Sequence, residues 1–260
     1  MTTKGIALVT GAAQSLGKTI ALRLADDGFD VAVNDLPSNA EKLAEVMNEI
    51  QAKGRASSAH IADVSIEKQV KNMVAEVVNA HGGLDVMVAN AGVAMWGTIL
   101  NTTVEEWDRI MAINGRGTFL CYKYAGMQMI AQGRGGRIIG ASSVAGKSGF
   151  SSLSAYCSSK FAVRGLTQAA ALEFGKHGIT VNAYAPGGID SEMLTGLAVG
   201  YSKDTGTPPE VWLDAQKNAS SLGRLGYFTD ISSLVSFIAS KESQFITGQS
   251  ISANGGTYFD

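Results

Sequence analysis

Short apolar runs alternate with longer amphipathic segments along most of the chain, and this alternation most constrains the fold. Runs such as GIALVT (Gly5–Thr10) and LDVMVA (Leu84–Ala89) are typical of strands buried on both faces. Between them, segments such as Asn39–Lys53 carry apolar residues at helical spacing. Strands separated by helices of this length predict a parallel sheet with helices on both faces, which is the doubly wound α/β class.

The same pattern places the individual elements. Strands are expected at Gly5–Thr10, Asp30–Asn34, Ala56–Ile61, Leu84–Ala89, Gly136–Gly140, Thr180–Tyr184 and Gln249–Ala253. Helices are expected at Lys18–Asp27, Asn39–Lys53, Ile66–His81, Val104–Gln132 and Ala155–His177. The chain shows no internal repeat or linker, so residues 1–260 are expected to form one domain.

The segment Ile189–Leu222 is the one region predicted to be irregular. The residues that interrupt a long helix there are Gly196, Gly200, Gly206 and Pro208-Pro209. A loop of this length in a compact domain is usually functional, so we expect a substrate loop or lid at about 189–222.

Composition and charge exclude several classes of protein. The chain is 45% hydrophobic and carries a net charge of -2 with no block of like charge, which argues against partners such as nucleic acid or an anionic membrane. No apolar run reaches the ~20 residues of a membrane helix. The cysteines, Cys121 and Cys157, are too few for a disulfide framework. A strand expected this close to the first residue leaves no room for a signal peptide, so we expect a cytoplasmic protein.

A glycine-containing turn follows the first strand. The turn TGAAQSLG (Thr10–Gly17) leads into a helix, where backbone N–H groups can converge on a phosphate. Gly11 would let the chain turn and Gly17 would let helix and strand pack closely. The alternative is a turn of this composition without a ligand.

Asp35 favours the ligand-binding alternative and indicates which ligand. It directly follows the second strand, and an acid there can accept hydrogen bonds from both hydroxyls of an adenosine ribose. Its charge would repel a 2′-phosphate, no Lys or Arg occurs in residues 36–40, and Gln14 brings no positive charge to the turn. The sequence therefore predicts NAD(H) as the cofactor in preference to NADP(H).

Other strand ends supply further candidates. Asp63-Val64 would contact the adenine, or alternatively Asp63 would cap the next helix. Asn90-Ala91-Gly92 follows the fourth strand and is small enough to let a cofactor pass. Asn114 is a poor helix former inside an expected helix, so a polar role such as holding a water near Lys160 is plausible.

Tyr156 and Lys160 form the candidate catalytic pair. Residues four apart share one helix face, so both side chains would point into one site. A nearby ammonium favours the phenolate and would lower the tyrosine pKa from its usual value of about 10. Ser143, at the end of the fifth strand, would bind a substrate oxygen. An ordinary surface pair on a helix is the alternative for these two residues taken alone.

The ordered set of motifs resembles the short-chain dehydrogenase/reductase family over essentially the whole chain. The matching residues are Thr10–Gly17, Asp63, Asn90–Gly92, Asn114, Ser143, Tyr156, Lys160 and Pro186-Gly187. The resemblance implies a single Rossmann domain with a seven-stranded parallel sheet. It implies that Ser143 polarises the substrate oxygen, Tyr156 exchanges its proton, Lys160 binds the nicotinamide ribose and lowers the pKa of Tyr156, and Asn114 anchors a relay water.

The resemblance also implies the remaining cofactor contacts. Pro186, Gly187 and Ile189 would border the nicotinamide, with Ser191 near the carboxamide. The other positions expected to contact the cofactor are Gly11, Gln14, Ser15, Leu16, Gly17, Asp35, Leu36, Asp63, Val64, Asn90, Ala91 and Gly92.

Within the family, Tyr156–Gly187 and Leu222–Gly256 resemble the acetoin/diacetyl reductase and butanediol dehydrogenase branch. This similarity implies NAD-linked interconversion of a small ketone or diketone with its secondary alcohol. It also implies a homotetramer in which the helices around Asn101–Gln132 and Ala155–His177 meet between subunits. A sugar alcohol, a cyclic alcohol or a 3-oxoacyl thioester are alternative substrates, and a dinucleotide-binding regulator without turnover is the alternative of another class.

Three positions depart from the family pattern. Ser15 stands where the turn usually has its second glycine, and Ala89 replaces the first of two usual asparagines. Val144 stands where the butanediol branch tends to carry a glutamine that holds a second substrate oxygen, so a larger or more apolar substrate is possible. The expected substrate contacts are Ser143, Val144, Phe150 and Tyr156, and the further pocket candidates, which are equally plausible as core or interface residues, are Met95, Trp96, Leu153 and Trp212.

No metal site is predicted. The histidines His60, His81 and His177 lie far apart in the sequence and have no carboxylate cluster beside them. Cys157 is expected to be a small packing residue rather than a reactive thiol.

Overall fold

A computed structural model describes residues 3–260 and contains a seven-stranded parallel sheet in the order β3-β2-β1-β4-β5-β6-β7. The strands are β1 (Ile6–Thr10), β2 (Asp30–Asp35), β3 (Ser57–Ile61), β4 (Val86–Ala89), β5 (Gly136–Ala141), β6 (Ile179–Pro186) and β7 (Ser250–Ala253). Each expected strand is present, with ends that shift by at most two residues. The predicted doubly wound Rossmann fold is therefore confirmed.

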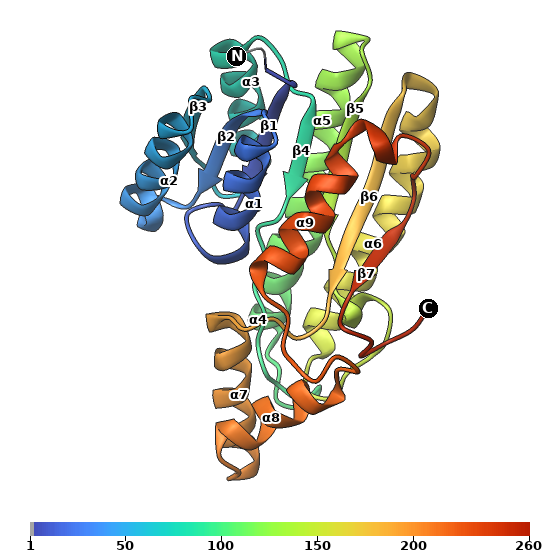
Figure 1. Cartoon of the computed structure of the whole chain (residues 1–260). Coiled ribbons are helices and arrows are strands. Elements are labelled where there is room, and N and C mark those ends of the chain that lie inside the picture. The colour runs from blue at the N-terminus through green and yellow to red at the C-terminus, as the bar shows by residue number, and fades with distance from the viewer. Residues whose placement is uncertain (1–2) are drawn as a thin grey trace.

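Helices connect the strands and cover both faces of the sheet (Figure 1). The α-helices are α1 (Ser15–Asp26), α2 (Ala40–Ala52), α3 (Glu67–His81), α4 (Val104–Ile110), α5 (Thr118–Gln132), α6 (Ser154–Phe174), α7 (Glu192–Thr205), α8 (Pro209–Ala219) and α9 (Phe228–Ala239). Short 3₁₀ turns are η1 (Pro37–Asn39), η3 (Val144–Gly146), η4 (Gly175–His177) and η5 (Lys241–Ser243), and η2 (Met111–Gly117) is π-helical.

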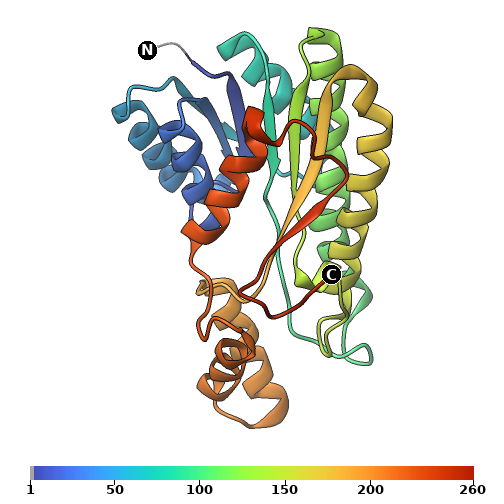
Figure 2. The same ribbon diagram turned by 45° about the vertical axis from the view of Figure 1, so that its right-hand side comes forward.

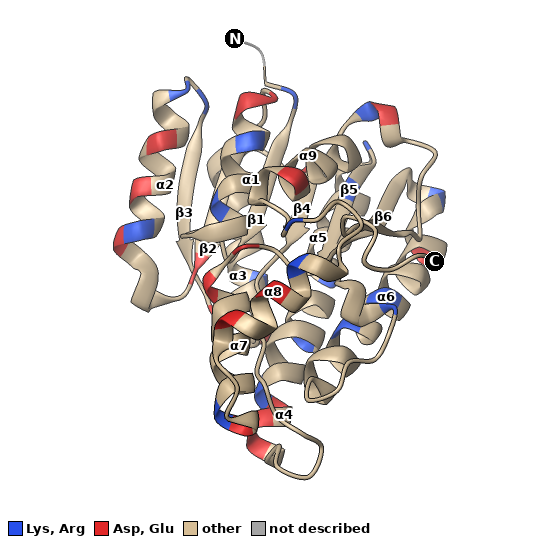
Figure 3. Cartoon of the chain, turned by 60° about the horizontal axis from the view of Figure 1, so that its bottom comes forward, with Lys and Arg blue, Asp and Glu red and all other residues tan. Residues whose placement is uncertain are grey.

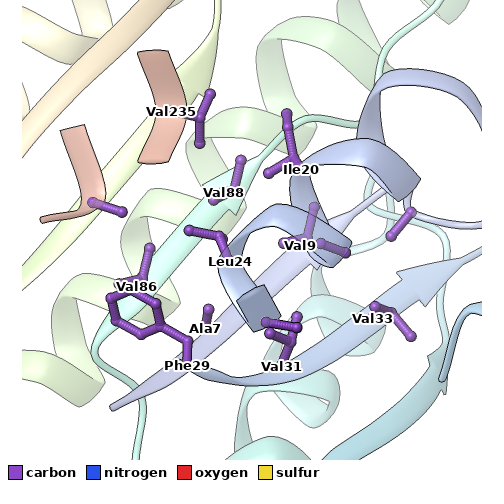
Figure 4. Close-up of a cluster of buried hydrophobic side chains, with 14 of the residues drawn as sticks. Ala7, Val9, Ile20, Leu24, Phe29, Val31, Val33, Val86, Val88 and Val235 are labelled. Atoms are coloured by element: carbon purple, nitrogen blue, oxygen red, sulfur yellow. The ribbon is translucent and has the colours of Figure 1, made fainter. Parts of the chain in front are cut away.

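Two apolar layers hold the helices on the sheet. On one face, α1, α2 and α9 pack on the strands; Figure 4 shows Ile20 and Leu24 of α1 above the valines of β1, β2 and β4. On the other face, α3, α5 and α6 pack on the opposite side chains of the same strands. Burial on both faces explains why β1 is apolar throughout rather than alternating.

The predicted loop at 189–222 is wrong, because most of it forms α7 and α8. Gly206 ends α7 with a φ of +72°, and Pro209 begins α8 in the first turn, where its missing N–H costs no hydrogen bond. Gly200 lies within α7 because a neighbouring side chain fills the space a methyl group would occupy. Figures 1 and 2 show α7 and α8 as a lobe beyond the carboxyl ends of the strands.

Two further helical features differ from expectation. The helix expected at Val104–Gln132 is interrupted by η2, in which Asn114, Gly115 and Gly117 are poor helix formers. The helix α9 was not predicted, although Ile231, Val235 and Ile238 have helical spacing and are buried. Its serines and its position after a glycine-rich segment masked this signal.

In the view of Figure 3, positions of Lys or Arg and of Asp or Glu are interspersed along the ribbon on the side that carries α7 and α8. Among the described residues, no helix has both the length and the apolar content needed to cross a bilayer.

Candidate active site

One cavity of about 690 Å³ lies at the carboxyl ends of the strands, where the sheet order reverses between β1 and β4. Every residue predicted to contact cofactor or substrate lines this cavity, from the turn at Gly11 and the carboxylate of Asp35 to Ser143 and Tyr156. Asn114 is the exception among the predicted site residues, and it lies just behind the wall. The geometry thus brings the predicted set together, while the role of each residue stays a prediction.

Glycines keep the phosphate-binding part of the cavity open. Gly11 has a φ of +64°, and a Cβ at Gly17 would lie 2.0 Å from the carbonyl oxygen of Gly11. Any side chain at Gly17 would therefore separate α1 from the end of β1. The N-terminus of α1 remains close to the cavity, as expected for binding a pyrophosphate.

Ser15 adopts a left-handed backbone conformation, with a φ of +51°. This region favours glycine, and a non-glycine residue there stores backbone strain of about 1–3 kcal/mol. The conformation explains why this position of the turn suits glycine. Here the strained residue is half-buried and lines the cavity.

Asp35 is buried and its carboxylate is held by three donors. Oδ2 accepts the backbone N–H of Ala13 at 3.0 Å, and Oδ1 accepts the N–H of Leu36 and the side-chain amide of Asn39, both at 2.8 Å. These bonds hold the carboxyl group in place at the cavity wall. Asn39 was not singled out from the sequence, since a polar residue four positions after a strand has many other uses.

Asp63 and Val64 both line the cavity at the end of β3. The alternative that Asp63 caps the following helix is wrong, because the residue at the N-cap of α3 is Ile66. The Asp63 carboxylate instead accepts the N–H of Ser65 at 2.8 Å, which tightens the turn before α3. A contact with adenine stays a prediction for this pair.

Asn90 connects the ends of three strands. Its amide donates to the carbonyl oxygens of Thr10 at 2.8 Å and Gly11 at 3.2 Å, and its Oδ1 accepts the hydroxyl of Tyr184 at 2.8 Å. Tyr184 of β6 is buried and also lines the cavity. Sequence reasoning missed Thr10 and Tyr184 as partners of Asn90, since both lie in apolar strand segments.

Ser143, Tyr156 and Lys160 face one another in the cavity wall. Ser143 follows β5, and its Oγ accepts the N–H of Ala145 at 3.1 Å. Tyr156 lies in the first turn of α6 and is hydrogen-bonded with Ser143. One turn later, the Lys160 Nζ lies 5.4 Å from the centre of the Tyr156 ring and donates to the carbonyl oxygen of Ala141 at 2.8 Å.

Burial dominates the electrostatics of this pair. Burial raises the pKa of Tyr156 to about 12, although the hydrogen bond with Ser143 acts in the opposite direction. Burial also lowers the pKa of Lys160 to about 8. The expectation that Lys160 brings the pKa of Tyr156 below its usual value is therefore not met in this structure. At neutral pH, Tyr156 is a protonated acid beside a charged lysine.

Asn114 lies in the π-helical segment η2 and is fully buried. Its amide donates to the carbonyl oxygen of Val93 at 2.8 Å and to Ser159 Oγ at 3.0 Å, and its Oδ1 accepts the N–H of Val93 at 2.9 Å. Both amide hydrogens are therefore used to hold the segment after β4 against α6. A role in holding a water stays a prediction.

The other pocket candidates divide into two groups. Trp96, Phe150, Leu153 and Trp212 line the cavity, whereas Met95 is not among the residues that line it. The structure adds Leu197 of α7 to the lining residues, which no sequence signal indicated because its helix was not predicted.

The histidines are closer in space than the sequence suggested. Ser58 Oγ lies 2.8 Å from His60 Nε2 and 2.7 Å from His81 Nε2, so two of them meet beside β3. Nevertheless, residues 3–260 contain no group of three or more His, Cys, Asp and Glu side chains arranged to hold a metal ion.

The residues of the cavity fit a nicotinamide dinucleotide. The glycine turn supplies space for a pyrophosphate, and Asp35 supplies an acceptor for ribose hydroxyls. At Gly92, an added Cβ would lie 3.4 Å from Lys160 Nζ and 3.3 Å from Asn114 Oδ1, so a side chain there would crowd the lysine.

Comparison with known proteins agrees with this site. Residues 11–258 match the family model described as enoyl-(acyl carrier protein) reductase. A short-chain dehydrogenase/reductase of Armillaria gallica is 51% identical, with 98% of this chain and 96% of that protein covered. A 3-oxoacyl-[acyl-carrier-protein] reductase of Staphylococcus aureus is 42% identical (97% of both), and the L-2,3-butanediol dehydrogenase of Corynebacterium glutamicum is 39% identical (98% and 99%).

Solved structures show the same similarity. Acetoin dehydrogenase from Enterobacter cloacae superimposes with a TM-score of 0.85 at 33% identity, covering 99% of this chain and 96% of that one. Carveol dehydrogenase from Mycobacterium avium in complex with NAD gives a TM-score of 0.92 at 29% identity, covering 98% of both chains. The chain belongs to the short-chain dehydrogenase/reductase family and is an oxidoreductase of that family.

The strain at Ser15 is testable. We expect Ser15→Gly to raise the free energy of unfolding by about 1 kcal/mol, since glycine adopts a positive φ without steric cost. Urea denaturation measures this change. As a control, Ser202→Gly within α7 should lower it by about 0.5–1 kcal/mol. Loss of stability in both variants would show that Ser15 is not strained.

Proposed function

We propose that this protein is an NAD(H)-dependent oxidoreductase that interconverts a ketone and its secondary alcohol, with Tyr156 as the general acid and base. The observation that carries the proposal is a single cavity with the buried carboxylate of Asp35 at one end and the Ser143, Tyr156 and Lys160 cluster at the other. This is the separation of roles that a dinucleotide-dependent reaction requires: one end binds the cofactor and the other handles a proton.

The side chains of the cluster have complementary tasks. When bound, the nicotinamide supplies a hydride with both electrons to the carbonyl carbon, or accepts it in the reverse direction. With substrate bound, Ser143 donates its hydroxyl hydrogen to the substrate oxygen and positions it. In reduction, the Tyr156 O–H bond breaks as its proton passes to that oxygen, which completes the alcohol. The phenolate that remains is stabilised by Lys160 and regains a proton from solvent.

Lys160 has donors to spare for the cofactor. An ammonium has three hydrogens, and the carbonyl oxygen of Ala141 uses one of them. The other two are available for ribose hydroxyls. Asn114 holds the segment after β4 against α6 and so positions the wall beside Lys160.

The relatives support more than one substrate. The butanediol and acetoin dehydrogenases support a small diketone or acetoin-like substrate, and the acyl-carrier-protein reductase supports a 3-oxoacyl thioester. All of these substrates use the same conversion of a carbonyl group to an alcohol. Diacetyl and acetoin are therefore suitable reference substrates, whichever compound the protein uses best.

A homotetramer is the assembly that we propose. Exposed apolar side chains on α5 and α6, such as Met127, Phe161 and Leu172, support burial of these helices between subunits. Light scattering of the purified protein measures the assembly state.

Tyr156→Phe tests the acid–base assignment. We expect kcat for ketone reduction to fall by at least about 100-fold, because the proton donor is lost. The NADH dissociation constant, measured by fluorescence, should change by less than about threefold. The matched control is Tyr124→Phe, whose hydroxyl contacts Glu67 on the surface and which should keep full activity. Turnover retained by Tyr156→Phe would remove this residue from the proton transfer.

Asp35→Ala tests the cofactor preference. Loss of charged hydrogen bonds to the ribose should raise the KM for NADH by about 10- to 100-fold, while the KM for NADPH stays level or falls. Because Asp35 also holds three protein donors, thermal unfolding of the variant serves as the control for an intact fold. An unchanged ratio of the two KM values would place cofactor choice elsewhere.

The pH dependence of reduction follows from Lys160. Its pKa is lowered to about 8, so its charge is present below that pH and is lost above it. Tyr156, with a pKa of about 12, stays protonated throughout. With saturating NADH, kcat/KM for the ketone should be level from about pH 6 to about pH 7 and fall as the pH rises through about 8. A profile that stays level to about pH 10 would contradict a role for the lysine charge.

A further inference from the structure

The substrate end of the cavity is built largely from hydrocarbon. Leu153, Cys157 and Leu197 belong to one buried apolar cluster, and Trp96, Trp212 and the ring of Tyr156 pack against it. One side of the tyrosine ring that would carry the proton donor therefore packs on apolar side chains. This cluster is separate from the two layers that hold the helices on the sheet.

Three aromatic rings from different parts of the chain form one wall, here called the aromatic wall: Trp96 after β4, Tyr201 of α7 and Trp212 of α8. Trp96 meets Tyr201 edge-on at 5.5 Å between ring centres and Trp212 edge-on at 5.9 Å. The two tryptophans line the cavity, while Tyr201 packs behind them. Such ring pairs are rigid and bury large apolar areas.

Packing determines how Trp96 is presented. A Cβ at Gly200 would lie 2.4 Å from the Cβ of Trp96, so only glycine lets Trp96 pack directly on the backbone of α7. The indole N–H donates to the Asp204 carboxylate at 3.3 Å. Its polar atom is thereby engaged by α7, and what remains for a ligand is the hydrocarbon of the ring.

This end offers two polar groups at the reacting oxygen. Ser143 and Tyr156 supply hydroxyls there, and the next residue, Val144, is apolar and buried. A second substrate oxygen beside the first would face this valine and lose its hydrogen bonds to water without replacement, which is costly. Arg109, Ser151 and Glu192 also line the cavity and are exposed, and the half-buried Gln216 lines it one turn after Trp212 on α8.

We propose that the preferred substrate is a mainly hydrocarbon ketone or secondary alcohol with a ring-bearing body, which packs against Trp96 and Trp212, rather than a small diketone or an acyl thioester. This inference rests on the proposed function and specifies its substrate class. The single oxygen binds between Ser143 and Tyr156, and the ring body fills the apolar space beside the aromatic wall.

A set of ketones separates the substrate classes. With purified protein and saturating NADH, kcat/KM would be measured for 2-decalone, cyclohexanone, diacetyl, acetoin and acetoacetyl-CoA. Each methylene buried against the wall should raise kcat/KM about three- to fourfold. We therefore expect 2-decalone to exceed cyclohexanone by at least about tenfold, and both to exceed the other three compounds.

The outcomes distinguish this inference from the function it rests on. Faster reduction of diacetyl, acetoin or acetoacetyl-CoA than of either cyclic ketone would overturn the substrate class and leave the proposed reaction intact. Binding of NADH without reduction of any ketone would overturn both.

Variants of the wall give a second, independent readout. Trp212→Ala should lower kcat/KM for 2-decalone by at least about tenfold and that for diacetyl by less than about threefold, because only the larger ketone reaches the ring. Trp212→Phe keeps a ring and should restore most of the loss, which also guards against a folding defect. The matched control is Trp107→Ala, since Trp107 of α4 does not line the cavity. Equal losses for the two ketones in Trp212→Ala would overturn the contact.

Discussion

The hydrogen bonds of one half-buried amide group join the strands that build the cavity. Asn90, at the end of β4, binds the end of β1 through Thr10 and Gly11, and binds β6 through the hydroxyl of Tyr184. A single side chain thus places three parts of the cavity relative to one another: the glycine turn after β1, the end of β4, and strand β6, which leads to Pro186. The arrangement also explains why Ala89 suffices at the preceding position, since it points into an apolar layer and needs no polar contact.

Burial gives the site its chemical character. Removing Tyr156 and Lys160 from water disfavours the charged form of each, which moves their pKa values in opposite directions. Tyr156 therefore keeps its proton at neutral pH, and the pKa of Lys160 falls to about 8, so that its ammonium group can lose a proton slightly above neutral pH. The sequence reveals that the two side chains are close on one helix face, but this proximity alone does not determine their pKa values. The pKa values also depend on how completely the neighbouring elements bury this face of α6.

The sequence predicts the sheet and most of the cavity wall, because both depend on local signals. Buried parallel strands are continuous apolar runs, and cofactor-binding residues follow their ends at short distances along the chain. Contacts between distant segments leave no such signal. Gly200 has the composition of a helix breaker, and only the structure shows that Trp96, from a distant part of the chain, occupies the space beside it. Helix α7 was misjudged for this reason.

The lobe of α7 and α8 has an evolutionary consequence. It is encoded by one continuous stretch between β6 and α9, and it projects from the sheet rather than forming part of it (Figure 2). Insertions, deletions and substitutions in this stretch can reshape the space around a substrate while the hydrogen bonds of Asp35, Asn90 and Lys160 stay in place. Mutations confined to α7 and α8 can therefore adapt such a fold to new substrates. The residues that take part in hydride and proton transfer are inherited unchanged.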